Sequence, residues 1–99
     1  MKDLNELRLE LNEIDDKIVE LLSRRMDICA EIGEYKKNTG KPVLDTKREE
    51  EKLDMVAGLV EDDKKSGVKE TFRTIMSESR KLQEIIISSE NTPTSISGE

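Results

Sequence analysis

The sequence predicts an all-α fold of three helices, one very long and two shorter, whose core is shared with a second chain. The apolar residues recur at steps of three and four, which is the period of an amphipathic helix. Only 33% of the 99 residues are hydrophobic and 40% are charged, so one chain has little material for a core of its own. Long amphipathic helices that pack against a partner reconcile these observations.

The first segment, residues 2–38, is expected to form one long helix. Its apolar stripe extends from Leu4 to Tyr35, as in a coiled coil. Gly40 and Pro42 end it, because glycine suits a helix C-terminus and proline cannot continue a helix. Such a helix measures ~50 Å at 1.5 Å per residue, which exceeds the need of so small a domain. We therefore expect it to lie along a partner chain.

The second helix is expected to begin near Asp45 or Thr46. Thr46 and Glu49 have the spacing of a capping box, in which the first residue caps the helix and the second reaches back to it. The apolar stripe of this helix ends at Val60, and the charged residues 61–65 are interpreted as its frayed end.

Ser66-Gly67 is expected to form a turn, and the third helix is expected over residues 68–88. Residues 1–88 then form one helical domain. Residues 89–99 are rich in serine and threonine, and we expect a disordered polar tail there.

Charge and composition argue against several partners and chemistries. A net charge of −6 without a basic block does not suit nucleic acid, and no apolar run could span a membrane. The chain starts without a secretory signal and has one cysteine, Cys29, so we expect a cytoplasmic protein. Because histidine is absent, histidine-based catalysis and most transition-metal sites are excluded.

Each predicted helix carries a polar residue on its apolar face. These residues are Arg25 in the first helix, Glu49 in the second and Ser79 in the third. A buried charge is costly unless it is paired, so these positions indicate a polar pocket inside the helical core.

Helical spacing adds further residues to this pocket. Lys36 lies 11 residues beyond Arg25, which is close to three turns, so both project from one face about 16 Å apart. Gln83 follows Ser79 by four residues and lies one turn along the same face. The gap between the two cations suits a small anion.

Three more residues are candidates because of their place in the chain. Arg48 lies at the start of the second helix, where the Asp45 side chain can cap free amides. Arg8 lies 17 residues before Arg25, or ~25 Å along a helix, so the two cannot bind one small ligand from the same helix. An antiparallel partner would bring its own Arg8 to the pocket.

Each of these residues taken singly has a structural explanation. Arg25 in a heptad seam most often sets the register, Glu49 can close a capping box and Ser79 allows close packing. The others would be surface residues: Arg8, Lys36, Asp45, Arg48 and Gln83. Composition and periodicity alone therefore lead to a helical dimer with an anion pocket.

Several short segments, in their order and spacing, are similar to one known family. They are Leu7-Arg8, Ile14-Asp15, Leu21-Leu22-Ser23-Arg24-Arg25, Ile32-Gly33-Glu34-Tyr35-Lys36, Pro42-Val43-Leu44-Asp45-Thr46-Lys47-Arg48-Glu49, and Ser79 with Gln83. Over roughly residues 4–88 the chain resembles the all-helical chorismate mutases. The resemblance implies an intertwined homodimer with two equivalent sites, each built from both chains, that rearranges chorismate to prephenate without a cofactor or metal.

The resemblance also implies how the substrate carboxylates are bound. Arg25, together with Arg8 from the other chain, would hold the two carboxylates. Ser79 and Arg48 would support them.

The remaining residues would act on the ring and on the ether bond. The resemblance implies that Glu49, helped by the backbone around Asp45, accepts the C4 hydroxyl, while Lys36 and Gln83 donate to the ether oxygen. Positioning and preorganised donors then supply the catalysis. Because the Gln83 amide donates at any pH, we expect a nearly flat pH profile around neutrality.

Other functions remain open at this stage. An isochorismate-pyruvate lyase on the same fold shares the arginines, the lysine and the glutamine, but the segment from Asp45 to Glu49 favours the mutase. A non-catalytic helical dimerisation module would not depend on Arg25 or Lys36. The chain can also be the mutase domain of a longer bifunctional enzyme of the aromatic pathway, or need a partner enzyme for full activity.

Overall fold

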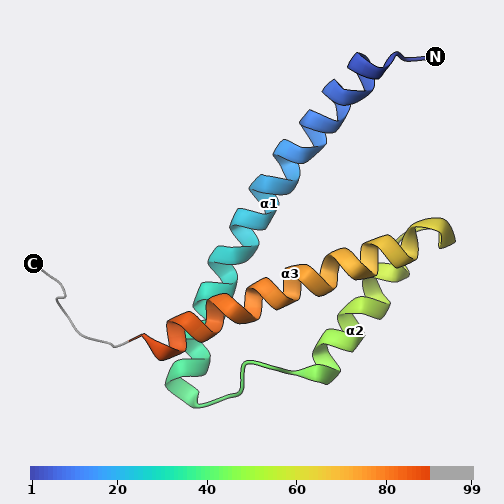
Figure 1. Cartoon of the computed structure of the whole chain (residues 1–99). Coiled ribbons are helices and arrows are strands. Elements are labelled where there is room, and N and C mark those ends of the chain that lie inside the picture. The colour runs from blue at the N-terminus through green and yellow to red at the C-terminus, as the bar shows by residue number, and fades with distance from the viewer. Residues whose placement is uncertain (90–99) are drawn as a thin grey trace, which may run out of the picture.

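The computed structural model describes residues 1–89 and consists of three α-helices (Figure 1). Their bounds are Leu4–Thr39 for α1, Thr46–Ala57 for α2 and Asp62–Ser88 for α3. No strand occurs within this part of the chain. The prediction of an all-α chain with one very long and two shorter helices is therefore confirmed. The predicted tail, apart from Ser89, lies outside the described residues.

The long helix α1 is closed at both ends by local interactions. At its start, the Asp3 side chain accepts a hydrogen bond from the Glu6 backbone N–H, and the Glu6 side chain accepts one from the Asp3 backbone N–H. At its end, Gly40 adopts a left-handed conformation with φ of 75°, and its N–H donates to the Lys36 carbonyl. Gly40 thus terminates the helix as the sequence predicts.

The second helix, α2, is capped by Asp45. The Asp45 carboxylate accepts a hydrogen bond from the Arg48 backbone N–H at 3.1 Å, as expected for this side chain. Thr46 is already the first helical residue, so the capping box predicted for Thr46 and Glu49 does not form. The helix ends at Ala57 and is followed by Gly58.

The third helix begins six residues earlier than predicted, at Asp62 instead of residue 68. The acidic residues Asp62 and Asp63 occupy its first turn, where negative charge is stabilised by the helix dipole. Ser66-Gly67 therefore lies inside α3 and does not form a turn. The chain reverses instead between Gly58 and Glu61, so the acidic run starts one helix and does not end another.

The third helix packs against both of the others, and the linker of residues 40–45 connects α1 to α2 (Figure 1). The N-terminal half of α1 extends past α2 and α3, and every residue from 4 to 21 is exposed. The radius of gyration is 18.0 Å, whereas a compact chain of this length has about 13 Å. None of the described helices has an apolar stretch that could cross a membrane.

The helices α1 and α3 pack closely at Gly33. This glycine is buried, and a Cβ atom added to it would lie 3.2 Å from the Gln83 Cα and 3.4 Å from the Ile86 Cβ. Glycine inside a helix weakens it by about 0.5–1 kcal/mol relative to alanine. Close packing of α3 against α1 explains why a glycine stands at this position.

Candidate active site

A pocket of about 370 Å³ lies between α1, the linker, α2 and α3. All of the site residues predicted from the sequence, except Arg8, line it. These residues are Arg25 and Lys36 from α1, Asp45 from the linker, Arg48 and Glu49 from α2, and Ser79 and Gln83 from α3. Residues that are far apart in the sequence therefore meet in one concave site.

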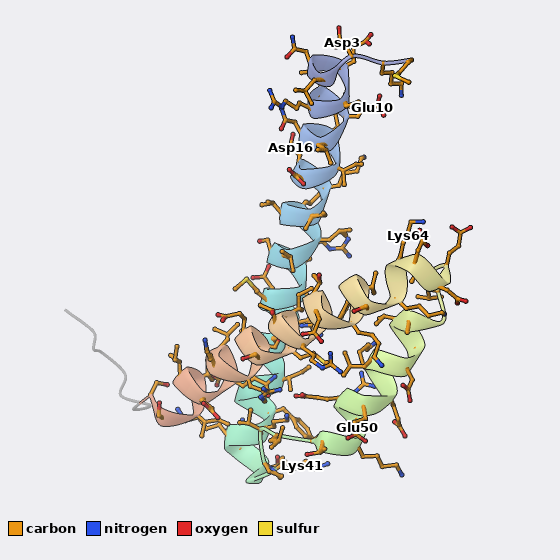
Figure 2. All side chains as sticks on the ribbon, turned by 45° about the vertical axis from the view of Figure 1, so that its right-hand side comes forward. Asp3, Glu10, Asp16, Lys41, Glu50 and Lys64 are labelled. Atoms are coloured by element: carbon orange, nitrogen blue, oxygen red, sulfur yellow. The ribbon has the colours of Figure 1, made fainter. Side chains whose placement is uncertain are left out.

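Arg8 does not line this pocket within one chain. It lies in the exposed part of α1, between Asp3 and Glu10, which Figure 2 shows on the segment that extends past the other two helices. The structure thus keeps Arg8 away from Arg25, as the length of the helix requires.

Arg25 is held in place from α3. Its Nη1 donates to the Ser79 Oγ at 2.5 Å and makes a weaker contact with the Cys29 Sγ at 3.7 Å. The Ser79 hydroxyl donates in turn to the Ile75 carbonyl at 2.9 Å. Because Ser79 accepts from the guanidinium and donates to the backbone, it restricts the orientation of Arg25 across the α1–α3 contact.

Lys36 connects the end of α1 to the linker. Its Nζ donates to the Val43 carbonyl at 2.9 Å, and it is partly buried. Further along the chain, Lys41 lies in the linker, and its Nζ is 5.7 Å from the centre of the Tyr35 ring, a cation–π contact. These interactions hold the linker against α1, and they keep both lysines at the pocket.

Glu49 forms an ion pair across the α2–α3 contact. The Nη1 of Arg80 lies 2.5 Å from each of its carboxylate oxygens. The side chains are 24% and 30% exposed for Glu49 and Arg80, so solvent screens this pair less than a surface pair. The carboxylate that lines the pocket is thereby anchored to the neighbouring helix.

Gln83 is the most buried polar residue of the site, with 6% of its surface exposed. Its Oε1 is buried and has no hydrogen-bond partner within the described part of the chain. Rotation of the amide exchanges its oxygen and nitrogen, so either atom can face a ligand. A buried amide oxygen without a hydrogen-bond partner is uncommon in native proteins, and a functional role is one explanation for it.

The lining of the pocket is strongly cationic. The positively charged side chains outnumber the carboxylates of Asp45 and Glu49; they are Arg25, Lys36, Lys41, Arg48 and Lys52. Such a local field attracts an anion even though the whole chain carries a net charge of −6. Within the described residues, no group of three or more Cys, Asp or Glu is arranged to hold a metal ion. The arrangement is suited to a small organic dianion.

Several residues of the site were not predicted from the sequence. Lys41 and Lys52 line the pocket, as do the apolar residues Val43 and Met76. Lys52 lies three residues after Glu49 on α2, so helical spacing could have indicated it. Arg80 follows Ser79 directly, but nothing in the sequence indicates that it pairs with a residue 31 positions away.

Comparison with known proteins gives two kinds of match. The family model described as chorismate mutase type II matches residues 7–84. A chorismate mutase of Methanocaldococcus jannaschii is 29% identical over 86 residues, covering 84% of this chain and 86% of that protein. A bifunctional chorismate mutase/prephenate dehydratase of Aquifex aeolicus is 36% identical over 59 residues, covering 60% of this chain but only 16% of that protein. No solved structure matches the chain.

Proposed function

The chain belongs to the chorismate mutase type II family and acts as an isomerase, and we propose that it converts chorismate to prephenate in the pocket between its three helices. The observation that carries this proposal is the convergence of the predicted residues, all but Arg8, on one cationic pocket. Chorismate carries two carboxylates, so it matches the charge of the lining.

The reaction needs a defined substrate conformation above all. The ether C–O bond breaks as a C–C bond forms, so the enolpyruvyl arm must lie over the ring. Arg25 would hold one carboxylate, because Ser79 restricts its guanidinium, and Arg48 would support binding from α2. Holding the reacting atoms close together is among the largest contributions that an enzyme makes to such a reaction.

Stabilisation of the transition state would come from Lys36 and Gln83. Negative charge develops on the ether oxygen as the C–O bond breaks, and donors placed there in advance lower the barrier. A lysine ammonium has three donor hydrogens, so Lys36 can keep its bond to the Val43 carbonyl while it donates to the substrate. Glu49, with the backbone around Asp45, would accept the ring hydroxyl.

We propose further that the active protein is an intertwined homodimer. The stripe at the free end of α1 is apolar but 46% to 58% exposed in one chain; it comprises Leu4, Leu7, Leu11, Ile14, Ile18 and Leu21. An exposed apolar surface of this extent indicates an interface with another protein chain. A second copy of α1, laid antiparallel, would cover the stripe and bring Arg8 of the partner subunit to the pocket. A protein that sediments as a folded monomer and is fully active in the chorismate assay would contradict this proposal.

The alternative functions make different predictions. An isochorismate-pyruvate lyase would cleave isochorismate in preference to chorismate, so assays with both substrates separate the two enzymes. A non-catalytic module would convert neither. The family match and the segment from Asp45 to Glu49 favour the mutase.

We place the reaction in the cytoplasm and in the biosynthesis of aromatic amino acids. The single cysteine suits a reducing compartment. The Aquifex relative is named for both chorismate mutase and prephenate dehydratase, which supports a role in the same pathway.

The decisive experiment is the loss of chorismate absorbance with purified protein and no additions. We expect Lys36→Ala to lower kcat by about 10²–10³-fold, the usual effect of removing one such donor. Lys37→Ala is the matched control, because Lys37 bonds to Ser89 and does not line the pocket. A wild-type protein that folds but leaves chorismate unchanged would refute the proposed function.

A further inference from the structure

The proposed mechanism assigns no role to the ion pair between Arg80 and Glu49, although Glu49 lines the pocket. This pair joins α2 to α3 at 2.5 Å, and both side chains are partly buried. Most other ion pairs of the described residues are exposed and join neighbours on the same helix, such as Arg73 with Glu70. The Arg80 pair differs because it fixes a residue of the pocket.

Glu49 lies in the wall between two cavities. One is the pocket described above, and the other is a smaller cavity of about 230 Å³ between α2 and α3. Glu49 lines both cavities, whereas Arg80 lines only the smaller one. Arg80 therefore binds the carboxylate from the side away from the proposed substrate.

This contact leaves Glu49 able to accept another hydrogen bond. A carboxylate has about four acceptor positions, and a single Nη1 between the two oxygens occupies the inner ones. The outer positions stay available to a hydroxyl in the pocket. Arg80 can thus orient the carboxylate without competing with the substrate.

Without Arg80, Glu49 has another cation within reach. Lys52 lies three residues further along α2 and lines the same pocket. Residues at this spacing face each other on a helix, so an unheld Glu49 would turn toward Lys52 and away from the position that accepts a hydroxyl.

We infer that Arg80 is a positioning residue, which holds the Glu49 carboxylate where it accepts a hydroxyl group of the substrate. The inference rests on the proposed function, since it names how that site recognises the hydroxyl of its ring. It makes the affinity for a hydroxylated dicarboxylate depend on a residue outside the pocket.

A double-mutant cycle with Glu49 tests this inference. We expect Arg80→Met to raise KM for chorismate about ten-fold, as when a charged hydrogen bond is lost, with a smaller change in kcat. Glu49→Ala alone should raise KM at least as much. Arg80→Met added to Glu49→Ala should then change KM by less than two-fold, because there is no carboxylate left to position.

The controls separate positioning from a loss of folding. Loss of folded protein lowers the apparent kcat but leaves KM unchanged, so the KM of each variant is the informative value. Lys81→Met is the matched control, since it breaks an exposed pair with Glu78 on the same helix, lines neither cavity and should leave KM unchanged. If Arg80→Met does not fold, Arg80→Lys keeps a cation in place, and its smaller rise in KM should also vanish in the Glu49→Ala background.

Three results would overturn the inference. An unchanged KM in Arg80→Met with an active wild type would show that Glu49 needs no positioning. Additive effects of the two substitutions would show that Arg80 acts independently of Glu49. An inactive wild type would refute the proposed function, and this inference with it.

Discussion

Replacing Gly33 with alanine is expected to weaken both the fold and the activity. The added Cβ would lie 3.2 Å from the Gln83 Cα and 3.4 Å from two atoms of Ile86. All of these atoms belong to α3, so the contact is relieved only if that helix moves by a few tenths of an ångström. Overpacking of this kind costs about 1–3 kcal/mol, and the better helix propensity of alanine offsets about 1 kcal/mol of it.

The net loss of stability is therefore about 0–2 kcal/mol, and each kcal/mol lowers Tm by about 4–8 °C in a domain of this size. Since Gln83 moves with α3, we also expect kcat to fall roughly three- to ten-fold, less than the hundred-fold effect of a 1 Å displacement. Circular dichroism melting and the chorismate assay measure the two effects.

Gly67→Ala is the matched control for this substitution. Gly67 lies inside α3, and apart from its chain neighbours and the backbone of its own helix, no atom of the described residues is within 4 Å of the Cβ that alanine would add. Only the higher helix propensity of alanine then affects stability. We therefore expect the free energy of unfolding to rise by about 1 kcal/mol, with a higher Tm and unchanged kinetics. If Gly33→Ala raised Tm equally and kept wild-type turnover, the close approach of α1 to α3 would be refuted.

Further predictions concern pH, helix capping and assembly. Gln83→Glu should confine activity to acid pH, because a carboxyl group donates only when protonated and burial raises its pKa. The wild-type pH–rate profile should be nearly flat, and a steep fall of wild-type activity toward neutrality would contradict this prediction. Asp45→Ala should lower Tm by about 4–8 °C through loss of the N-cap, whereas Asp45→Asn should preserve it. Ile14→Glu should give monomers in sedimentation and lose activity, and a stable active dimer would argue against the α1 interface.

Several parts of the fold followed from local sequence signals. The apolar period and Gly40 predicted the extent and the end of α1, because both act within one turn of the helix. The predicted start of α3 at residue 68 was wrong because it also relied on a local signal. Ser66-Gly67 favours a turn by composition, but Asp62 and Asp63 stabilise a helix N-terminus before it, and packing against α2 completes that helix.

In the candidate site, likewise, relations within one helix could be predicted and contacts between helices could not. Spacing on each helix grouped Arg25 with Lys36 and Ser79 with Gln83, because residues on one helical face keep their relation in any fold. The ion pair between Arg80 and Glu49 could not be predicted, since the two residues lie on different helices. Lys52 was not predicted, although it lies three residues after Glu49 and therefore on a neighbouring position of the same helical surface.

The sequence by itself determined that the chain is helical, where its longest helix ends, and which polar residues interrupt the apolar faces, since these properties depend on neighbours within a few residues. Only the tertiary structure decided that α3 packs closely on α1 at Gly33, that Lys36 donates a hydrogen bond to the Val43 carbonyl, and that Arg80 forms an ion pair with Glu49. Such contacts join residues from different elements, and their free energy depends on how whole helices pack, which no local pattern records.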